Sequence, residues 1–265
     1  MCDFVVAYIL DRYLEKDPSS RVALECQLKD EHATLSGEVT SRHQFTSIEL
    51  AAFVREAIRK IGYTRDYQVT FGAKNTISGD DISVTLHISQ QSSDIAQGVD
   101  REGWGDQGIF HGMAVDDPKH GNMPLDYWLA RELANRLYKS DIGGRDIKTQ
   151  VTVIDGKPTE VVVAIPLVDD IDRHFVEHEV RSLCGENVKI IINGTGRYLV
   201  HGPIGDCGTT GRKLVVDFYG GNSKIGGGSP WGKDPTKADV TLNYMAREIA
   251  LEEMRKRGTD VYAAL

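Results

Sequence analysis

Residues 21–40 read RVALECQLKDEHATLSGEVT, and this stretch carries the clearest structural pattern of the chain. Every second residue from Val22 to Leu28 is apolar, with polar or small residues between them. This period of two predicts a half-buried strand, and a second short strand is expected at 33–39. Apolar residues then share one face of a predicted helix at 44–61. This part of the chain is therefore predicted to form a sheet with a helix packed on it.

Outward from this stretch, the order strand–strand–helix–strand occurs twice. The first copy covers about 21–72 and the second about 147–192, although their sequences do not align. The other expected elements are helices at 4–14, 124–138, 170–184 and 236–256, and strands at 68–72, 82–89, 147–154, 159–167, 187–192 and 214–218. The repetition predicts an α+β fold in which helices cover one face of mainly antiparallel sheets.

Composition excludes several classes of protein. The chain has 265 residues, of which 40% are hydrophobic and 26% charged, as in ordinary globular proteins of one or two domains. No apolar run reaches the roughly 18–20 residues that cross a bilayer, and the start lacks the basic segment of a secretory signal. The net charge of −8 argues against nucleic-acid binding. Because the four cysteines show no Cys-x-x-Cys spacing, we expect free thiols in a cytoplasmic protein without membrane contact.

Two glycine-rich regions, 90–123 and 194–235, show no regular periodicity apart from the short apolar strand expected in the second. Both repeatedly place glycine beside arginine, lysine or aspartate. Cations neutralise phosphate oxygens, carboxylates hold magnesium, and glycine lets the backbone approach a ligand closely. A single such pair would indicate an ordinary solvated loop. Their repetition favours a binding site for a polyphosphate.

Two short motifs suggest more specific alternatives. Residues 174–178 (HFVEH) match the His-x-x-Glu-His pattern of some zinc enzymes, but the surrounding charges are typical of a solvated helix surface. Residues 227–233 fit Gly-x4-Gly-Lys, but Asp234 follows where a P-loop needs Ser or Thr to hold magnesium. We therefore favour neither a zinc site nor a true P-loop, although a glycine-rich loop with a lysine can still bind phosphate.

A series of longer motifs runs in order along nearly the whole chain. They are QQSSDIAQG at 90–98, GDQG at 105–108, KTQVT at 148–152, GPIGDCG at 202–208, TGRK at 210–213, DFYGG at 217–221 and GGGSPWGKDPTK at 226–237. Together they resemble S-adenosylmethionine synthetase, also called methionine adenosyltransferase. The resemblance implies a pseudo-threefold α+β repeat with a reduced third unit. It implies one compact unit over 1–265, with repeats at about 15–105 and 140–235 and a third part built from 1–14, 106–139 and 236–265.

The same resemblance implies a reaction. The enzymes of this family join the methionine sulfur to the 5′ carbon of ATP and release tripolyphosphate, which is then hydrolysed to phosphate and diphosphate. ATP and L-methionine are the implied ligands, Mg²⁺ and K⁺ the implied cofactors, and a homodimer with sites shared between subunits the implied assembly. Two alternatives remain open: a catalytically weak or inactive ligand-binding or regulatory subunit, which could pair with a complementary chain, and an enzyme that only hydrolyses tripolyphosphate.

The resemblance also assigns roles to individual residues. The expected catalytic residues are Lys148, Arg212, Lys213, Lys233 and Lys237. The expected ATP-binding residues are Asp146, Lys148, Thr195, Gly196, Arg197, Tyr198, Asp206, Arg212, Lys213, Ser229, Lys233 and Lys237. The expected methionine-binding residues are Glu38, Gln91, Asp106, Asp206 and Lys237, and the expected metal ligands are Asp239 for magnesium and Glu25 for potassium.

The sequence departs from the family pattern at several positions. The family carries Gly-His-Pro-Asp-Lys directly before the first helix, with a catalytic role for the histidine, whereas this sequence begins with Met-Cys-Asp after that point. We therefore expect a member shortened at both ends, in which synthesis is slow. Tyr198 stands where the family usually has Phe, Ile225 where it has His, and residues 229–231 read Ser-Pro-Trp where Ala-Phe-Ser is usual.

Overall fold

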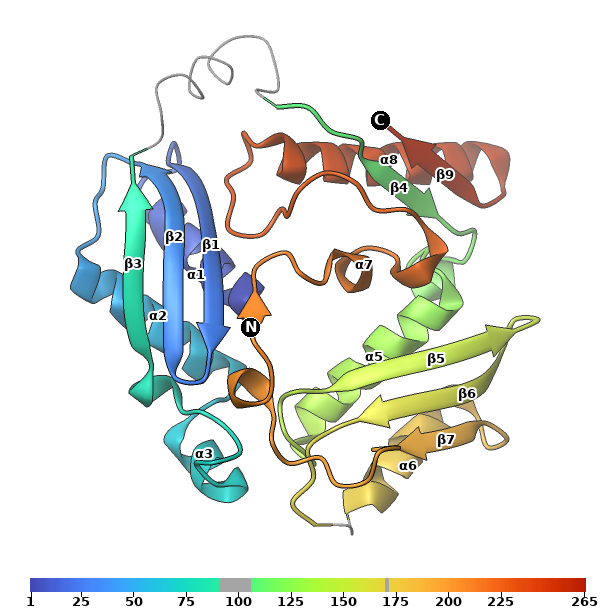
Figure 1. The fold of residues 1–265 in the computed structure, drawn as a ribbon. Coiled ribbons are helices and arrows are strands. Elements are labelled where there is room, and N and C mark those ends of the chain that lie inside the picture. The colour runs from blue at the N-terminus through green and yellow to red at the C-terminus, as the bar shows by residue number, and fades with distance from the viewer. Residues whose placement is uncertain (91–105, 170–171) are drawn as a thin grey trace.

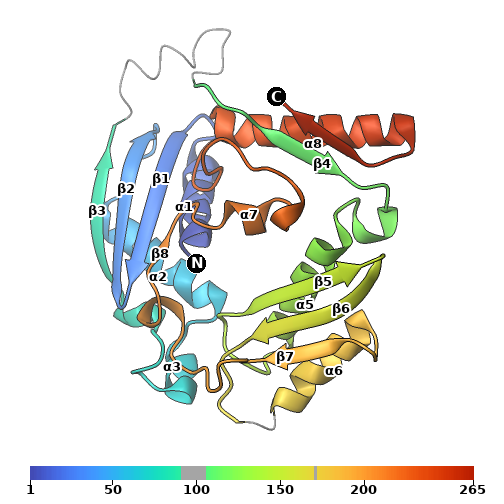
Figure 2. The ribbon, with the colours of Figure 1, turned by 45° about the vertical axis from the view of Figure 1, so that its right-hand side comes forward.

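The computed structural model of the chain describes residues 1–90, 106–169 and 172–265. Within these ranges, three sheets lie around a central stretch of irregular chain that carries the short helix α7 (Leu214–Asp217), as Figures 1 and 2 show. The same described residues include four single 3₁₀ turns, η1 (Gly79–Asp81), η2 (Pro118–His120), η3 (Gly202–Ile204) and η4 (Gly220–Asn222). Across the described ranges, no helix has the length and apolarity needed to cross a membrane.

The first sheet has the strand order β3-β2-β1-β8. Its strands are β1 (Arg21–Lys29), β2 (His32–Thr40), β3 (Ser83–Ser89) and β8 (Gly208–Thr209). β1 runs antiparallel to β2, and β3 runs parallel to β2. The alternating residues from Val22 to Leu28 are buried under α1 (Cys2–Lys16) and α2 (Ser47–Ile61). The strands and helices expected over 4–61 are confirmed.

Helix α2 begins at Ser47 because Thr46, at φ −70° and ψ 159°, is extended and caps the helix. Glu49 N–H donates to Thr46 Oγ1 at 3.3 Å, and Thr46 N–H donates to Glu49 Oε2 at 2.8 Å. This reciprocal capping box satisfies amide groups that have no partner inside the helix. Gly62, at φ 108°, ends the helix in the left-handed conformation. Local capping thus sets both ends of the helix that covers the first sheet.

The second sheet repeats the first. It consists of β5 (Lys148–Ile154), β6 (Lys157–Ala164) and β7 (Lys189–Ile192) in the order β5-β6-β7. β5 runs antiparallel to β6, and β7 runs parallel to β6, as in β1-β2-β3. The helices α5 (Leu125–Ser140) and α6 (Asp172–Cys184) bury their apolar sides against it around Leu133 and Val161. The predicted α+β repeat is confirmed, but the last strand of its first copy is β3 and not the strand expected at 68–72.

The third sheet is the smallest of the described sheets. It pairs β4 (His111–Ala114) with β9 (Val261–Ala264), and both strands lie against α8 (Ala238–Arg257). The sequence pattern predicted α8 but neither strand, since each has only four residues. The reduced third unit is thus observed as one helix and one strand pair.

Two strand predictions are wrong. Residues 68–72 were expected to form a strand, but they belong largely to helix α3 (Arg65–Phe71), which Thr64 caps by accepting from Tyr67 N–H. Residues 214–218 were also expected to form a strand, but they form α7. The edge of β1 that faces away from β2 already pairs with β8 and, at Ala23, with Lys233. An additional apolar strand therefore cannot pair there.

The contact between β4 and α8 requires glycine at position 112. A Cβ atom on Gly112 would lie 1.9 Å from the carbonyl oxygen of Ala246 and 2.2 Å from its carbon. We expect Gly112→Ala to lower the free energy of unfolding by about 2–3 kcal/mol, because the strand and helix must separate. Urea titration measures the change. Gly221→Ala is the matched control, because a Cβ there has nothing within 4 Å, and equal stability of the two variants would contradict this account.

Candidate functional site

The glycine-rich loop 226–237 is anchored along the edge of β1. Leu24 N–H donates to Gly232 O at 3.0 Å, and Asp234 N–H donates to Val22 O at 3.0 Å. The Asp234 carboxylate, only 1% exposed, accepts in turn from Val22 N–H at 2.7 Å. The loop therefore continues the first sheet, and a buried carboxylate fixes its position.

Lys233 and Asp239, two of the expected site residues, form an ion pair where this loop enters α8. The Nζ to Oδ2 distance is 2.5 Å, and the side chains are 20% and 12% exposed. Gly228 N–H donates to the other carboxylate oxygen, Oδ1, at 2.7 Å. A Cβ on Gly228 would lie 2.4 Å from Asp239 Oδ2, so the close approach needs glycine. A cation of the loop and a carboxylate of the first turn of α8 are thus held together.

Asp239 is the expected magnesium ligand. In the part of the chain that the structure describes, no three His, Cys, Asp or Glu side chains gather into a metal cluster. Mg²⁺ is usually held by one or two carboxylates together with substrate phosphates. Each oxygen of the Asp239 carboxylate already accepts one hydrogen bond, from Lys233 or from the Gly228 amide, so magnesium would share this carboxylate with the lysine. Glu25, the expected potassium ligand, is exposed on β1 and would need oxygen ligands from elsewhere.

A second group of expected residues lies at the start of β5. The Tyr198 hydroxyl donates to Asp146 Oδ2 at 2.7 Å, and Gly202 N–H donates to the same oxygen at 3.1 Å. Burial and this hydrogen bond raise the pKa of Tyr198, so the phenol stays protonated. Lys148 Nζ lies 4.0 Å from Asp146 Oδ1 and 5.4 Å from the centre of the Tyr198 ring. The Lys148 side chain is 68% exposed and free to reach a ligand.

A third group surrounds β8. Arg212 donates to Cys207 O at 2.7 Å, and another of its nitrogens lies 4.0 Å from the exposed carboxylate of Asp206. Gly211 N–H donates to Asp3 Oδ1 at 2.7 Å, so the first turn of α1 holds this loop in place. Asp3 was not among the expected site residues. Its contact joins positions 208 residues apart, which no local pattern reveals.

The other expected residues make fewer contacts. Thr195, Gly196, Arg197, Asp106 and Lys213 are exposed, Glu38 and Lys237 are half-buried, and Ser229 accepts from Trp231 N–H. Gln91 lies outside the described residues. Within the three described ranges, no hydrogen bond or ion pair joins the side chains of one group to those of another. The structure thus gathers the expected residues into separate groups.

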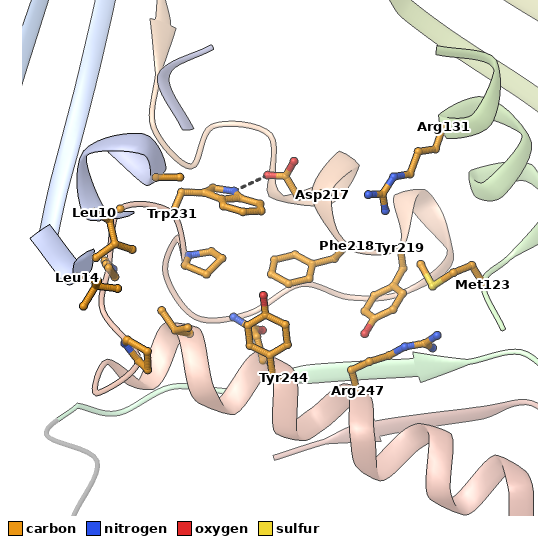
Figure 3. Close-up of a pocket in the computed structure, with 17 residues that line it drawn as sticks. Leu10, Leu14, Met123, Arg131, Asp217, Phe218, Tyr219, Trp231, Tyr244 and Arg247 are labelled. Carbon is orange, nitrogen blue, oxygen red and sulfur yellow. Dashed lines mark hydrogen bonds between the residues drawn. The ribbon is translucent and has the colours of Figure 1, made fainter. Parts of the chain in front are cut away.

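A cavity of about 680 Å³ lies beside the loop and was not expected from the sequence (Figure 3). Its lining includes Leu10 and Leu14 of α1, Phe218, Trp231, and Tyr244 of α8. Trp231 Nε1 donates to Asp217 Oδ2 at 2.9 Å, and burial raises the pKa of that carboxyl group. Part of the lining belongs to the motifs at 217–221 and 226–237, but the rest comes from α1, α8 and other distant segments, so no single motif indicates the cavity.

Two repeated sheets, a smaller third sheet and glycine-rich loops bearing lysine, arginine and aspartate are typical of an α+β enzyme that handles a polyphosphate. The family models agree with this class. The N-terminal domain of S-adenosylmethionine synthetase matches residues 1–93, and its C-terminal domain matches residues 200–257.

Similarity to individual proteins supports the same family. The S-adenosylmethionine synthase of Parafrankia sp. (strain EAN1pec) is 38% identical over 289 aligned residues, which cover 94% of this chain and 70% of the relative. The solved structure of an unusual S-adenosylmethionine synthetase from Campylobacter jejuni matches with a TM-score of 0.87 and 30% identity, over 100% of this chain and 73% of that one. The chain belongs to the S-adenosylmethionine synthetase family.

Proposed function

We propose that the chain is a methionine adenosyltransferase acting on ATP and L-methionine. The methionine sulfur attacks the 5′ carbon of ATP, the bond from that carbon to the phosphate oxygen breaks, and intact tripolyphosphate leaves. Water then splits the tripolyphosphate into phosphate and diphosphate. The observation that carries this proposal is the Lys233–Asp239 pair, which lies within the residues matched by the family's C-terminal domain.

The charge of the leaving group determines which side chains matter most. An in-line displacement needs no covalent bond to the protein, so catalysis must come from positioning and from stabilising the tripolyphosphate. Lys148 at the start of β5 and Lys233 on the loop 226–237 supply positive charge. The further proposed cations are Arg212, Lys213 and Lys237. Bound magnesium would neutralise phosphate oxygens, and Asp239 would hold it.

We assign the nucleotide to the second group of residues. The ring of Tyr198 offers a flat apolar surface for adenine, and its fixed hydroxyl prevents it from turning away. The proposed neighbours on the same loop are Thr195, Gly196 and Arg197. The proposed methionine-binding residues are Glu38, Gln91, Asp106, Asp206 and Lys237. The carboxylates among them can pair with the methionine ammonium group. Potassium is proposed at Glu25.

The separation of the three groups motivates the proposed assembly. In Figures 1 and 2, α8 and β5 lie in different parts of the molecule. A polyphosphate site needs several cations at one ligand. We therefore propose a homodimer in which residues 1–265 act as one unit and two copies complete each site. A complementary chain of the same family could take the second place.

The test is to incubate purified protein with ATP, methionine, Mg²⁺ and K⁺ and to follow products by chromatography. We expect S-adenosylmethionine whose formation saturates with both substrates. Absence of product at every enzyme concentration would contradict the proposal. ATP binding in calorimetry without product would favour a ligand-binding or regulatory subunit. Phosphate released only from added tripolyphosphate would favour an enzyme restricted to that hydrolysis.

A further inference from the structure

A buried histidine, His201, lies between helix α3 and the second group of residues, around Asp146, to which the nucleotide is assigned. It is 0% exposed and packs against the rings of Tyr67 and Phe71, with centroid distances of 5.7 and 5.1 Å. Its own backbone N–H donates to Asn75 O at 2.9 Å. No role in the proposed reaction uses this side chain, yet both of its ring nitrogens have a hydrogen-bond partner, as buried polar groups require.

The contacts of His201 fix the direction of each hydrogen bond. Nδ1 lies 2.5 Å from the carbonyl oxygen of Leu199, which can only accept, so Nδ1 carries the hydrogen. Burial lowers the pKa of His201, so the ring is neutral and Nε2 is an acceptor. The Tyr67 hydroxyl, 2.6 Å from Nε2, therefore donates to it. The same hydroxyl oxygen accepts from Arg145 N–H at 2.8 Å.

The hydrogen bonds of Tyr67 and His201 connect two backbone segments that both determine the position of Asp146. Arg145 directly precedes Asp146 in the sequence. Leu199 and His201 lie between Tyr198 and Gly202, which both donate to the Asp146 carboxylate. The Tyr67–His201 bond thus ties together the two backbone segments whose relative position sets the geometry at Asp146. Loss of the Tyr67 hydroxyl would leave a buried imidazole nitrogen and a backbone amide without their partner.

We propose that Tyr67 and His201 are positioning residues for ATP, which hold Asp146 and Tyr198 in the orientation that the nucleotide requires. The inference rests on the proposed function, because that function places adenosine beside these two residues. Neither Tyr67 nor His201 needs to touch a substrate. Their role requires only that the two backbone segments keep their relative position when the nucleotide binds.

The test is Tyr67→Phe, which keeps the ring and removes the hydroxyl. We expect the KM for ATP to rise about tenfold, while kcat and the KM for methionine change less than about twofold, since the loss concerns nucleotide orientation. Tyr138→Phe is the matched control. Its hydroxyl donates to Ile61 O at 2.9 Å and its ring lies 4.9 Å from the Arg145 guanidinium, so the same change nearby should leave all three constants unaltered.

Equal KM values for ATP in wild type and Tyr67→Phe would overturn the proposal, and so would a loss of kcat that merely follows the folded fraction. If Tyr67→Phe does not fold, His201→Gln and His201→Leu replace it. Glutamine keeps one donor and one acceptor and should retain the wild-type KM for ATP, whereas leucine should raise it. Equal values in these two variants would also overturn the proposal.

A second measurement separates this inference from the proposed function. Nitrogen-15 NMR of the histidine rings reports the tautomer of His201 in the wild-type protein without any substrate. We expect the neutral form with hydrogen on Nδ1, and hydrogen on Nε2 would overturn the inference. A wild-type protein that binds no ATP would contradict the proposed function. The tautomer of His201 would still show whether its hydrogen bonds have the donors and acceptors described above.

Discussion

Replacing Lys148 with alanine is expected to lower kcat for S-adenosylmethionine synthesis by about 10²–10³-fold. The Lys148 side chain is 68% exposed and its ammonium group lies 4.0 Å from Asp146, so it can reach a ligand without breaking a tight ion pair. Displacement places negative charge on the leaving tripolyphosphate, and a positioned cation stabilises that charge in the transition state. Steady-state kinetics at saturating ATP and methionine measure the effect.

The matched control is Lys157→Ala, which removes an exposed lysine from the neighbouring strand β6. We expect its kcat to remain within about twofold of the wild-type value, because isolated surface substitutions have small effects. Both variants should unfold at the wild-type temperature, so a lower rate in Lys148→Ala cannot come from unfolding. A folded Lys148→Ala protein with the wild-type rate would contradict the assignment of this lysine.

Replacing Lys233 with methionine is expected to abolish detectable synthesis and to lower the free energy of unfolding by about 3 kcal/mol. The variant removes a cation proposed to contact the polyphosphate. It also leaves the Asp239 carboxylate, 12% exposed, with the Gly228 amide but without the opposite charge 2.5 Å away. Product assays measure the first effect, and urea titration measures the second.

Two further variants separate the effect on activity from the effect on stability. The double variant Lys233→Met with Asp239→Asn removes both charges, so it should regain part of the lost stability but no synthesis. Lys224→Met, at an exposed position of the same glycine-rich region, should change neither property. Synthesis by the double variant at a rate near wild type would show that the pair has only a structural role.

Regular elements with strong periodicity could be predicted from the sequence. The alternation from Val22 to Leu28 is buried as expected, because that strand has one face under α1 and α2. The predictions that failed concern short segments or segments whose structure depends on distant contacts. Residues 68–72 look like a strand in isolation, but the Thr64 cap starts a helix there. The strands β4 and β9 pair across more than a hundred residues, so their partners decide their structure.

The candidate site could be predicted in its residue types but not in its geometry. Glycine beside lysine, arginine and aspartate indicated a polyphosphate site, and the structure pairs Lys233 with Asp239. The supporting contacts depend on residues far apart in the chain. Asp3 holds Gly211 across 208 positions, and Tyr67 holds His201 across 134. Such contacts arise from the packing of the sheets and helices, which no local pattern contains.

The most direct test of the proposed reaction is its stoichiometry. Purified protein is mixed with ATP, methionine, Mg²⁺ and K⁺, samples are quenched over time, and S-adenosylmethionine, phosphate and diphosphate are quantified in each sample. Displacement of intact tripolyphosphate followed by its hydrolysis predicts equal amounts of the three products throughout the steady state. Phosphate and diphosphate formed without S-adenosylmethionine, or ATP left intact in every sample, would contradict it.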